Sequence, residues 1–197
     1  MENDFETLIE SFIKDNVGIA DHFINHPLAQ HLKQNLLTLL AENKLMAAGT
    51  GNQQTILMDQ SIRSDSIYWL DRNHHNVYED EFFDLIDDFV KYLNRSCFAG
   101  ITSYEFHYSL YEQGSYYQKH LDQFKNNTSR KYSMISYLND DWVEADGGQL
   151  RIYQNYNNKT INPTEGQTVF FKSNELAHEV LVTNQRRMSI TGWLKRD

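Results

Sequence analysis

Apolar residues recur with a helical period in three stretches of the first hundred residues. The stretch FETLIESF (5–12) places them at i, i+3, i+4 and i+7, the spacing of an amphipathic helix. A second stretch (28–40) follows "NHP" and carries repeated leucines, and a third (82–93) has acidic residues early in it, as the helix dipole favours. We expect three helices whose apolar stripes pack against a core.

From about residue 101 the pattern changes to short runs rich in Tyr, Phe, Ile, Val and Thr, separated by turn sequences such as "ADGG" and "NPTEG". The runs are ITSYEFHYSLY, RKYSMISYL, GGQLRIYQNY, QTVFF, HEVLVT and RMSITGWL. Short strands without helices between them predict an antiparallel sandwich or barrel. We therefore predict an α+β protein with one domain over residues 1–197, in which residues 1–100 are mainly helical support and residues 101–197 form the β core.

Between the second and third predicted helices lies "GTGNQQTILMDQSIRSDSIYWLDRN" (49–73), with mixed strand and turn signals and with Arg63, Asp65 and Trp69 among polar neighbours. A surface loop is the simplest interpretation. Loops of this length in a compact domain are also often lids or binding segments, so both interpretations stay open.

Composition narrows the function classes. The net charge of −9 argues against nonspecific binding of nucleic acid, which needs a basic face. The sequence contains no run of 18 apolar residues, so we expect no membrane span. The acidic start MENDFETLIE does not resemble a secretory signal. The single cysteine, Cys97, leaves no intramolecular disulfide and no Cys-rich zinc module. These features lead us to expect a cytoplasmic protein without nucleic-acid or membrane partners; its oligomeric state has no signal in the sequence.

The stretch "GSYYQKHLDQF" contains a His-x-Asp, His120 and Asp122. If it is a strand, both side chains point the same way, and together they supply two of the three ligands of a 2-His-1-carboxylate metal site. A lone His-x-Asp is a common accident, so a distant third ligand is required. Of the eight histidines, His178 stands out because it begins an apolar run in the β region, although a surface histidine at a strand start is the plainer interpretation.

Arg187 follows His178 by nine residues, in "RRMSITGWL". In a strand it would share one face with Ser189, Thr191 and Trp193. If that face looks inward, the guanidinium is buried, which is unfavourable unless a carboxylate pairs with it. The alternative is a solvent-facing Arg187 beside Arg186, and the pattern alone does not decide between the two.

The ordered set His120-x-Asp122, His178 and Arg187 resembles the 2-oxoglutarate and Fe(II)-dependent dioxygenases. More narrowly, it resembles their prolyl 4-hydroxylase branch, which includes the hypoxia-inducible-factor prolyl hydroxylases and bacterial relatives. The supporting stretches are YEQGSYYQKHLDQF, SYLNDDWVEADGGQLRIY, PTEG, TVFFKSNELAHEV and RRMSITGW, about half of the chain, and IRSDSIYWL is similar to a substrate-side segment of that branch. The resemblance implies a double-stranded β-helix (jelly-roll) catalytic core with N-terminal helices packed against it.

The resemblance also implies roles for individual residues. His120, Asp122 and His178 would ligate Fe(II) and carry catalysis. The residues that would bind or line the site of the cosubstrate 2-oxoglutarate are Arg187, Tyr137, Thr191, Tyr111, Ile135, Leu150 and Trp193. Those on the substrate side would be Arg63, Asp65, Trp69 and Arg130. Plainer roles stay open for several of them: a buried core tyrosine, ordinary apolar barrel lining, or, for Arg130, a solvated surface charge.

The implied reaction uses O2 and 2-oxoglutarate to hydroxylate a substrate C–H bond, giving succinate and CO2, with ascorbate as a further candidate reductant. A prolyl residue in a protein is the leading substrate, with a translation factor first because bacterial relatives of the branch act on elongation factor Tu. Another side chain or a small molecule stays open. From other classes, the same three ligands fit a zinc-dependent hydrolase, and the barrel fits a non-catalytic binding module. Neither gives Arg187 and Tyr137 a reason to share the interior.

Overall fold

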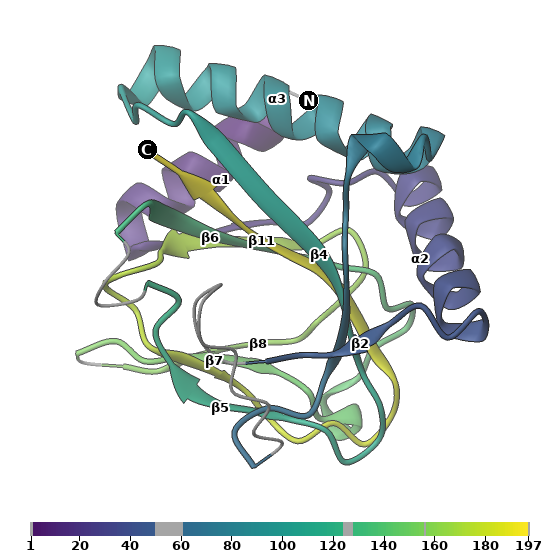
Figure 1. Ribbon diagram of the computed structural model, residues 1–197. Helices are drawn as coiled ribbons and strands as arrows, with labels where there is room; N and C mark the ends of the chain where they lie inside the picture. Colours follow the sequence, from purple (N-terminus) through teal and green to yellow (C-terminus); the bar gives the residue numbers. More distant parts are fainter. Residues whose placement is uncertain (1, 50–60, 124–127, 156, 197) are drawn as a thin grey trace.

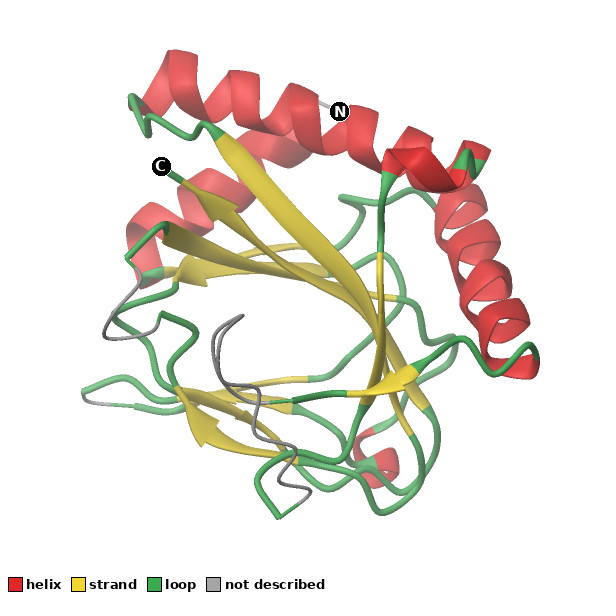
Figure 2. Ribbon diagram, viewed as in Figure 1, coloured by secondary structure: helices red, strands yellow, loops and turns green. Residues whose placement is uncertain are grey.

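The fold consists of two facing β-sheets with helices on the outer side of the larger sheet (Figure 1; Figure 2). It was obtained as a computed structural model, which describes residues 2–49, 61–123, 128–155 and 157–196. Both sheets are antiparallel, and together they form the jelly-roll core that the resemblance predicted.

Three α-helices lie in the described residues, and each contains one of the predicted stretches. They are α1 (Glu2–Asp15), α2 (His26–Ala41) and α3 (Val77–Cys97), and two short 3-10 turns, η1 (Arg72–His74) and η2 (Glu144–Asp146), accompany them. The side chain of Asn25 caps α2 by accepting a hydrogen bond from the backbone N–H of Leu28, and Asn76 caps α3 in the same way. No helix in the described part of the chain is long and apolar enough to cross a membrane.

The larger sheet has seven strands in the described residues. In spatial order they are β1 (Val17–Ala20), β9 (Thr168–Lys172), β6 (Arg130–Tyr137), β11 (Arg187–Lys195), β4 (Ser103–Tyr111), β3 (Ser66–Trp69) and β2 (Met46–Ala47). The smaller sheet has four, β5 (Tyr117–His120), β10 (His178–Val180), β7 (Leu150–Ile152) and β8 (Lys159–Ile161). The first hundred residues are therefore less purely helical than predicted, since they contribute β1, β2 and β3 to the larger sheet. β3 comes from the stretch that the simplest interpretation made a surface loop.

One face of the larger sheet packs against the helices, and the other faces the smaller sheet. On β11, Met188, Ile190 and Leu194 join the core beneath the helices, whereas Arg187, Ser189 and Trp193, the alternate positions, are buried on the side of the smaller sheet. Gly192 belongs to the helix side, where a Cβ would come within 2.2 Å of the Phe106 ring. The strand alternation thus separates the packing residues from the residues that face the smaller sheet.

The helix side is held mainly by aromatic packing. Phe170 of β9 is fully buried, with ring-centroid distances of 5.2 Å to Phe12, 5.6 Å to Phe89 and 4.8 Å to Tyr132. Aromatic pairs at these separations add to the free energy gained from burying their area. The helices therefore fix the position of the larger sheet, and its inner face is left for other uses.

Candidate metal centre and cosubstrate pocket

The smaller sheet brings two histidines together. His120, the last residue of β5, lies opposite His178, the first residue of β10, and their ring centroids are 4.3 Å apart. β5 ends at His120, so the two residues do not share one strand as the alternation argument assumed, and Asp122 lies in the bend that follows. Its carboxylate nevertheless reaches both rings, with Oδ1 at 3.4 Å from Nε2 of His120 and Oδ2 at 3.5 Å from Nε2 of His178. Within the described residues these three form a group whose donor atoms lie within 4.8 Å of one another.

Backbone carbonyls fix the orientation of both imidazoles. Nδ1 of His120 lies 2.7 Å from the carbonyl oxygen of Gln118, and Nδ1 of His178 lies 3.2 Å from that of Leu176. Because a carbonyl only accepts, Nδ1 carries the proton and Nε2 presents its lone pair on the side of Asp122. Burial lowers the pKa of His178 to about 4, against the opposing effect of Asp122, so this ring is neutral near pH 7.

Asp122 is held ionised in a buried position. Burial alone would raise the pKa of its carboxyl, yet the neighbouring histidines and the Ser133 hydroxyl hold that pKa well below its usual range. The Ser133 hydroxyl donates to Oδ2 at 2.6 Å and lies 2.9 Å from the hydroxyl of Ser173. Two neutral imidazoles and one carboxylate suit a divalent first-row metal, and three ligands on one side leave further coordination positions open.

The structure decides which way Arg187 points. Its side chain is buried between the sheets, where Nε donates to the carbonyl of Gly148 at 2.8 Å and Nη1 lies 3.4 Å from the Ser189 hydroxyl. Its guanidinium carbon is 5.0 Å from the centroid of the Tyr111 ring and 5.1 Å from that of Tyr137. Nη2 has no hydrogen-bond partner among the described residues. A buried cation with an unused donor requires an acceptor.

Tyr137 supplies a second unused donor beside Arg187. Its hydroxyl is buried and finds no hydrogen-bond partner in the described part of the chain. Burial raises the pKa of Tyr137 to about 12, so the phenol keeps its proton. Leaving a buried donor unsatisfied costs about 1–3 kcal/mol, and a ligand carboxylate would satisfy both groups. Thr191 is two residues after Ser189 on the same inner face, and the two hydroxyl oxygens are 3.5 Å apart.

The paired glycines make the approach to Arg187 possible. Gly147 and Gly148 both have positive φ, +69° and +63°, as the predicted tight turn required. A Cβ on Gly148 would lie 3.0 Å from Cδ of Arg187. The carbonyl of Gly148 can therefore orient the guanidinium only because the position carries no side chain.

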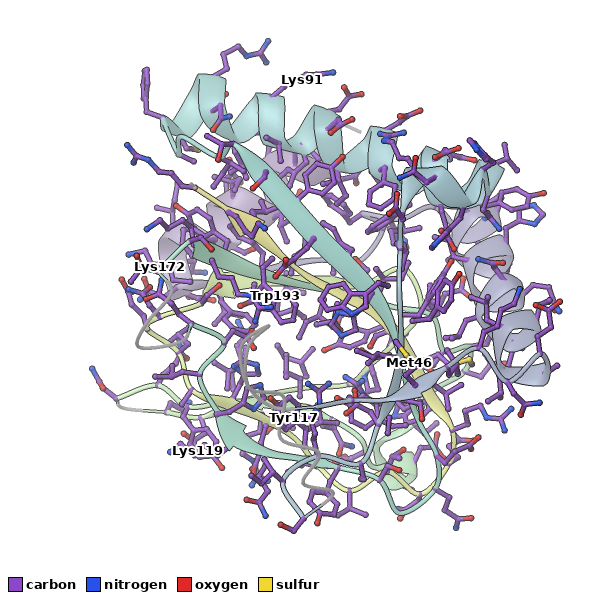
Figure 3. The ribbon with its side chains drawn as sticks, viewed as in Figure 1. Met46, Lys91, Tyr117, Lys119, Lys172 and Trp193 are labelled. Atoms are coloured by element: carbon purple, nitrogen blue, oxygen red, sulfur yellow. The ribbon has the colours of Figure 1, made fainter. Side chains whose placement is uncertain are left out.

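The predicted lining residues are all buried, and they come from both sheets. Tyr111, Ile135 and Trp193 belong to the larger sheet and Leu150 to the smaller one. Figure 3 shows Trp193 and Tyr117 on opposite sheets, with side chains filling the space between them. This apolar lining shields the buried polar groups from water, which strengthens their interaction with a charged ligand.

Arg63 and Asp65 form an ion pair with each other. Nε and Nη2 of Arg63 donate to the two carboxylate oxygens of Asp65 at 2.8 and 2.6 Å, and Asp65 is buried. The guanidinium lies 4.3 Å from the centroid of the Tyr117 ring, which in turn stacks on His120 at 3.6 Å. The pair thus supports the wall behind a candidate ligand. Residues 50–60 of the predicted lid lie outside the described residues.

Arg130 contacts the backbone of the candidate ligand Asp122, and Trp69 lies beside Trp193, on which Arg130 packs. Trp69 is partly exposed, and its ring centroid is 6.3 Å from that of Trp193. The Arg130 guanidinium lies 3.4 Å from the centroid of the Trp193 ring, donates to Glu105 at 2.9 and 2.7 Å, and places Nη1 3.4 Å from the carbonyl oxygen of Asp122. Arg130 is therefore a packed and paired residue, and the plainer interpretation as a solvated surface charge does not hold.

Two residues of the site were missed by the sequence analysis. Ser133 holds Asp122, and His107 lies buried on β4 between the rings of Trp69 and Trp193, at centroid distances of 4.9 and 5.4 Å. The strand period that puts Tyr111 on the inner face also puts His107 there, four residues earlier. That alternation was the available signal for His107, whereas the contact of Ser133 with Asp122 needed the three-dimensional arrangement.

Comparison with known proteins agrees with this geometry. The model of the 2OG-Fe(II) oxygenase superfamily matches residues 106–195. The matched region contains the three candidate metal ligands and Arg187, so these residues match an oxygenase domain of that superfamily. A prolyl-4-hydroxylase from Pseudomonas putida has a similar structure, with a TM-score of 0.88 and 29% identity over 98% of this chain and 99% of the other.

Two further solved structures share the fold of this chain. One is a prolyl hydroxylase from Trichoplax adhaerens in complex with a peptide fragment of the hypoxia inducible factor oxygen degradation domain, with a TM-score of 0.87 and 20% identity over 98% and 90% of the two chains. The other is a prolyl 4-hydroxylase from Phytophthora capsici, with a TM-score of 0.73 and 17% identity over 98% and 63%. The family match and the prolyl hydroxylase neighbours support a 2-oxoglutarate and Fe(II)-dependent dioxygenase that uses O2.

Proposed function

We propose that this dioxygenase hydroxylates C4 of a prolyl residue in a protein. The observation that carries the proposal is the likeness to the Pseudomonas putida prolyl-4-hydroxylase, which extends over nearly the full length of both chains. The Trichoplax adhaerens enzyme with a bound peptide supports a protein substrate. A translation factor is the first candidate, and it would place the protein in the cytoplasm.

In this proposal His120, Asp122 and His178 hold the metal. The donor set fits ferrous iron, because its two neutral nitrogens and one ionised carboxylate match a 2-His-1-carboxylate site. The carbonyls of Gln118 and Leu176 fix the imidazole tautomers, and the Ser133 hydroxyl fixes Asp122. These contacts hold the donors in place before any ion is bound.

Arg187 and Tyr137 would bind the distal carboxylate of 2-oxoglutarate. Both have an unused donor in the described part of the protein, and Arg187 presents it from a guanidinium already oriented by Gly148. Thr191 is next along the same inner face and can add its hydroxyl. This arrangement explains why a fully buried cation is retained in the interior.

The loaded iron centre supplies oxidative decarboxylation of 2-oxoglutarate and oxygen transfer to the substrate C–H bond. The residues of the chain would bind and orient the cosubstrate and the substrate and shield them from water. Arg187 and Tyr137 would orient the cosubstrate, and the buried Tyr111 and Leu150 would exclude water from it. Arg130, at the backbone of Asp122, and the partly exposed Trp69 would receive the substrate.

The experiment that tests this function has two parts. Purified protein is incubated with Fe(II), 2-oxoglutarate and O2, with and without ascorbate, and succinate is measured. Proteomes from cells with and without the protein are then compared for prolyl peptides heavier by one oxygen atom. We expect one or a few proline sites to lose this modification in the deficient cells, and we expect ascorbate to raise the turnover number.

The matched control is a strain that expresses Arg187→Lys at the wild-type level. It should show a partial loss of modification relative to the wild-type strain, because the fold is present and binding of the cosubstrate is weakened. Active succinate formation with no change at any proline would contradict the prolyl assignment and leave the dioxygenase assignment in place.

A further inference from the structure

Five buried side-chain atoms have no hydrogen-bond partner in the part of the chain that the structure describes: Arg187 Nη2, Tyr137 Oη, His107 Nδ1, Trp193 Nε1 and Gln167 Oε1. The first two are the donors assigned to 2-oxoglutarate. Gln167 is anchored elsewhere, since its amide nitrogen donates to Asp21 at 2.8 Å. His107 and Trp193 remain without a use in the proposed mechanism.

His107 and Trp193 are diagonal neighbours on the inner face. His107 on β4 lies opposite Thr191 of β11, and Trp193 is two residues further along β11. Their ring centroids are 5.4 Å apart, and Trp69 of β3, opposite His107, adds a third ring at 4.9 Å from His107. Three neighbouring strands thus form one aromatic wall that carries two unused nitrogens.

This wall stands at the metal end of β11. The cross-strand partner of Trp193 is Ser133, whose hydroxyl holds the Asp122 carboxylate. Arg187 lies six residues away on the same strand, a distance of about 20 Å at the rise of a β-strand. The carboxylate-binding pair and the His107–Trp193 pair therefore occupy opposite ends of one inner face, with the candidate metal ligands near the second pair.

The second pair is neutral, unlike the first. Burial lowers the pKa of His107 to about 3, and the cations of Arg63 and Arg130 act in the same direction. Those two cations already have carboxylate partners, Asp65 and Glu105. The indole N–H of Trp193 can only donate, and a neutral imidazole donates from Nδ1 in one of its tautomers. Two neutral donors among aromatic rings fit an uncharged acceptor, of which an amide carbonyl is the common example.

We propose that His107 and Trp193 bind a backbone carbonyl oxygen of the substrate and so position the target residue beside the metal. The inference rests on the proposed prolyl hydroxylation and deepens it. A prolyl residue has no N–H, so its backbone can be held only through carbonyl oxygens, and the site must then present donors. The surrounding rings offer apolar surfaces to the pyrrolidine ring.

The test compares His107→Leu, His107→Asn and Trp193→Phe with the wild-type protein. The probe is a pool of end-blocked heptapeptides with proline at the centre and random flanks, and hydroxyproline is the readout. Loss of one hydrogen bond should raise the apparent KM for the pool about fivefold in His107→Leu and Trp193→Phe, with a smaller change in kcat. His107→Asn should restore the KM to near the wild-type value, because the asparagine amide can place a donor close to the position of Nδ1. Gln167→Met is the matched control and should leave the KM unchanged.

The outcomes separate the two proposals. An unchanged peptide KM in His107→Leu, or an equal rise in the KM for 2-oxoglutarate, overturns the carbonyl-binding pair while the prolyl assignment stands. Wild-type protein that forms succinate but no hydroxyproline overturns the prolyl assignment itself, and the pair as a holder of prolyl peptides falls with it. A melting temperature of His107→Leu at or above the wild-type value supports the pair, because a residue kept for packing would lower it on replacement.

Discussion

The two faces of the larger sheet obey different rules. On the helix side, Met188, Ile190 and Leu194 pack among aromatic rings, and Gly192 leaves no space for even a methyl group. On the inner side, Arg187, Tyr137, His107 and Trp193 bury polar atoms that have no partner among the described residues. The residues of one face therefore stabilise the fold, and those of the other carry unpaired polar atoms that a ligand can satisfy. Residues of the two kinds alternate along the same strands.

The contrast is sharpest at three consecutive residues. Arg186 is partly exposed and pairs with Glu112, Arg187 is buried on the inner face, and Met188 joins the core beneath the helices. Substitutions at neighbouring positions of this strand should therefore change different properties of the protein. Changes on the inner face should appear in kinetics, and changes on the helix face should appear in unfolding.

The largest kinetic effect should follow Asp122→Ala. Loss of the carboxylate that reaches both histidines should lower succinate formation at least about 1,000-fold, equivalent to about 4 kcal/mol. Circular dichroism should show an unchanged fold. Asp140→Ala is the control, because Asp140 is a partly exposed carboxylate paired with Lys33 and should keep wild-type activity. Activity of Asp122→Ala within tenfold of wild type would mean that Asp122 is not a ligand.

On the helix face, Phe170→Ala should destabilise the fold. Removal of a fully buried ring that packs on three others should lower the free energy of unfolding by about 3–5 kcal/mol. Chemical denaturation gives this value. Ile13→Ala, at an exposed position of α1, should change it by no more than about 0.5 kcal/mol. A similar loss for both variants would remove the distinction between core and surface on this side.

Arg187→Lys should weaken cosubstrate binding and leave the fold intact. A lysine keeps the charge but loses the planar fork and the bond to the Gly148 carbonyl, so the KM for 2-oxoglutarate should rise about 10–100-fold. Arg186→Lys, one residue away on the exposed side, should leave this KM within about twofold of wild type. Equal effects at the two positions would show that burial of Arg187 has no part in binding.

His107→Leu should flatten the acid dependence of stability. In the folded protein the pKa of His107 is about 3, below the unfolded value of about 6.5, so the unfolded chain binds the proton first and stability falls as the pH drops below 6.5. Between pH 7 and pH 5 this contribution is about 2 kcal/mol, and the leucine variant should lack it. Urea unfolding of both proteins at the two pH values measures the difference. Parallel losses would mean that folding does not lower the pKa of His107.

The sequence was sufficient to predict the helices and strands that are long enough to show a regular alternation of apolar and polar residues. All three helices and the strands β4, β6, β7, β9, β10 and β11 lie where periodicity or strand-forming runs predicted them. β1 and β2 were missed because strands of four and two residues carry too few positions to show alternation. Their placement depends on partners that are distant in sequence, such as the pairing of Val17 with Phe171.

The site shows the same limit. The candidate ligands and Arg187 were found through their order along the chain, but the direction in which Arg187 points was undecided. Arg187, Ser189 and Thr191 alternate with apolar residues along β11, which is the pattern of a strand with one solvated face, yet both faces of this strand are buried. Asp122 lies past the end of β5, and the roles of Ser133 and His107 depend on which residues face each other across strands. Local sequence contains no record of that register.

The position of β5 has a consequence for stability. This strand is the outermost member of the smaller sheet, with β10 as its one neighbour there among the described strands. His120 ends it and Asp122 follows it, while His178 belongs to the neighbour. A metal ion held by these donors would therefore tie the edge strand to its neighbour and add its binding free energy to the stability of the folded state. We expect the melting temperature of the purified protein to rise when a divalent first-row metal is added.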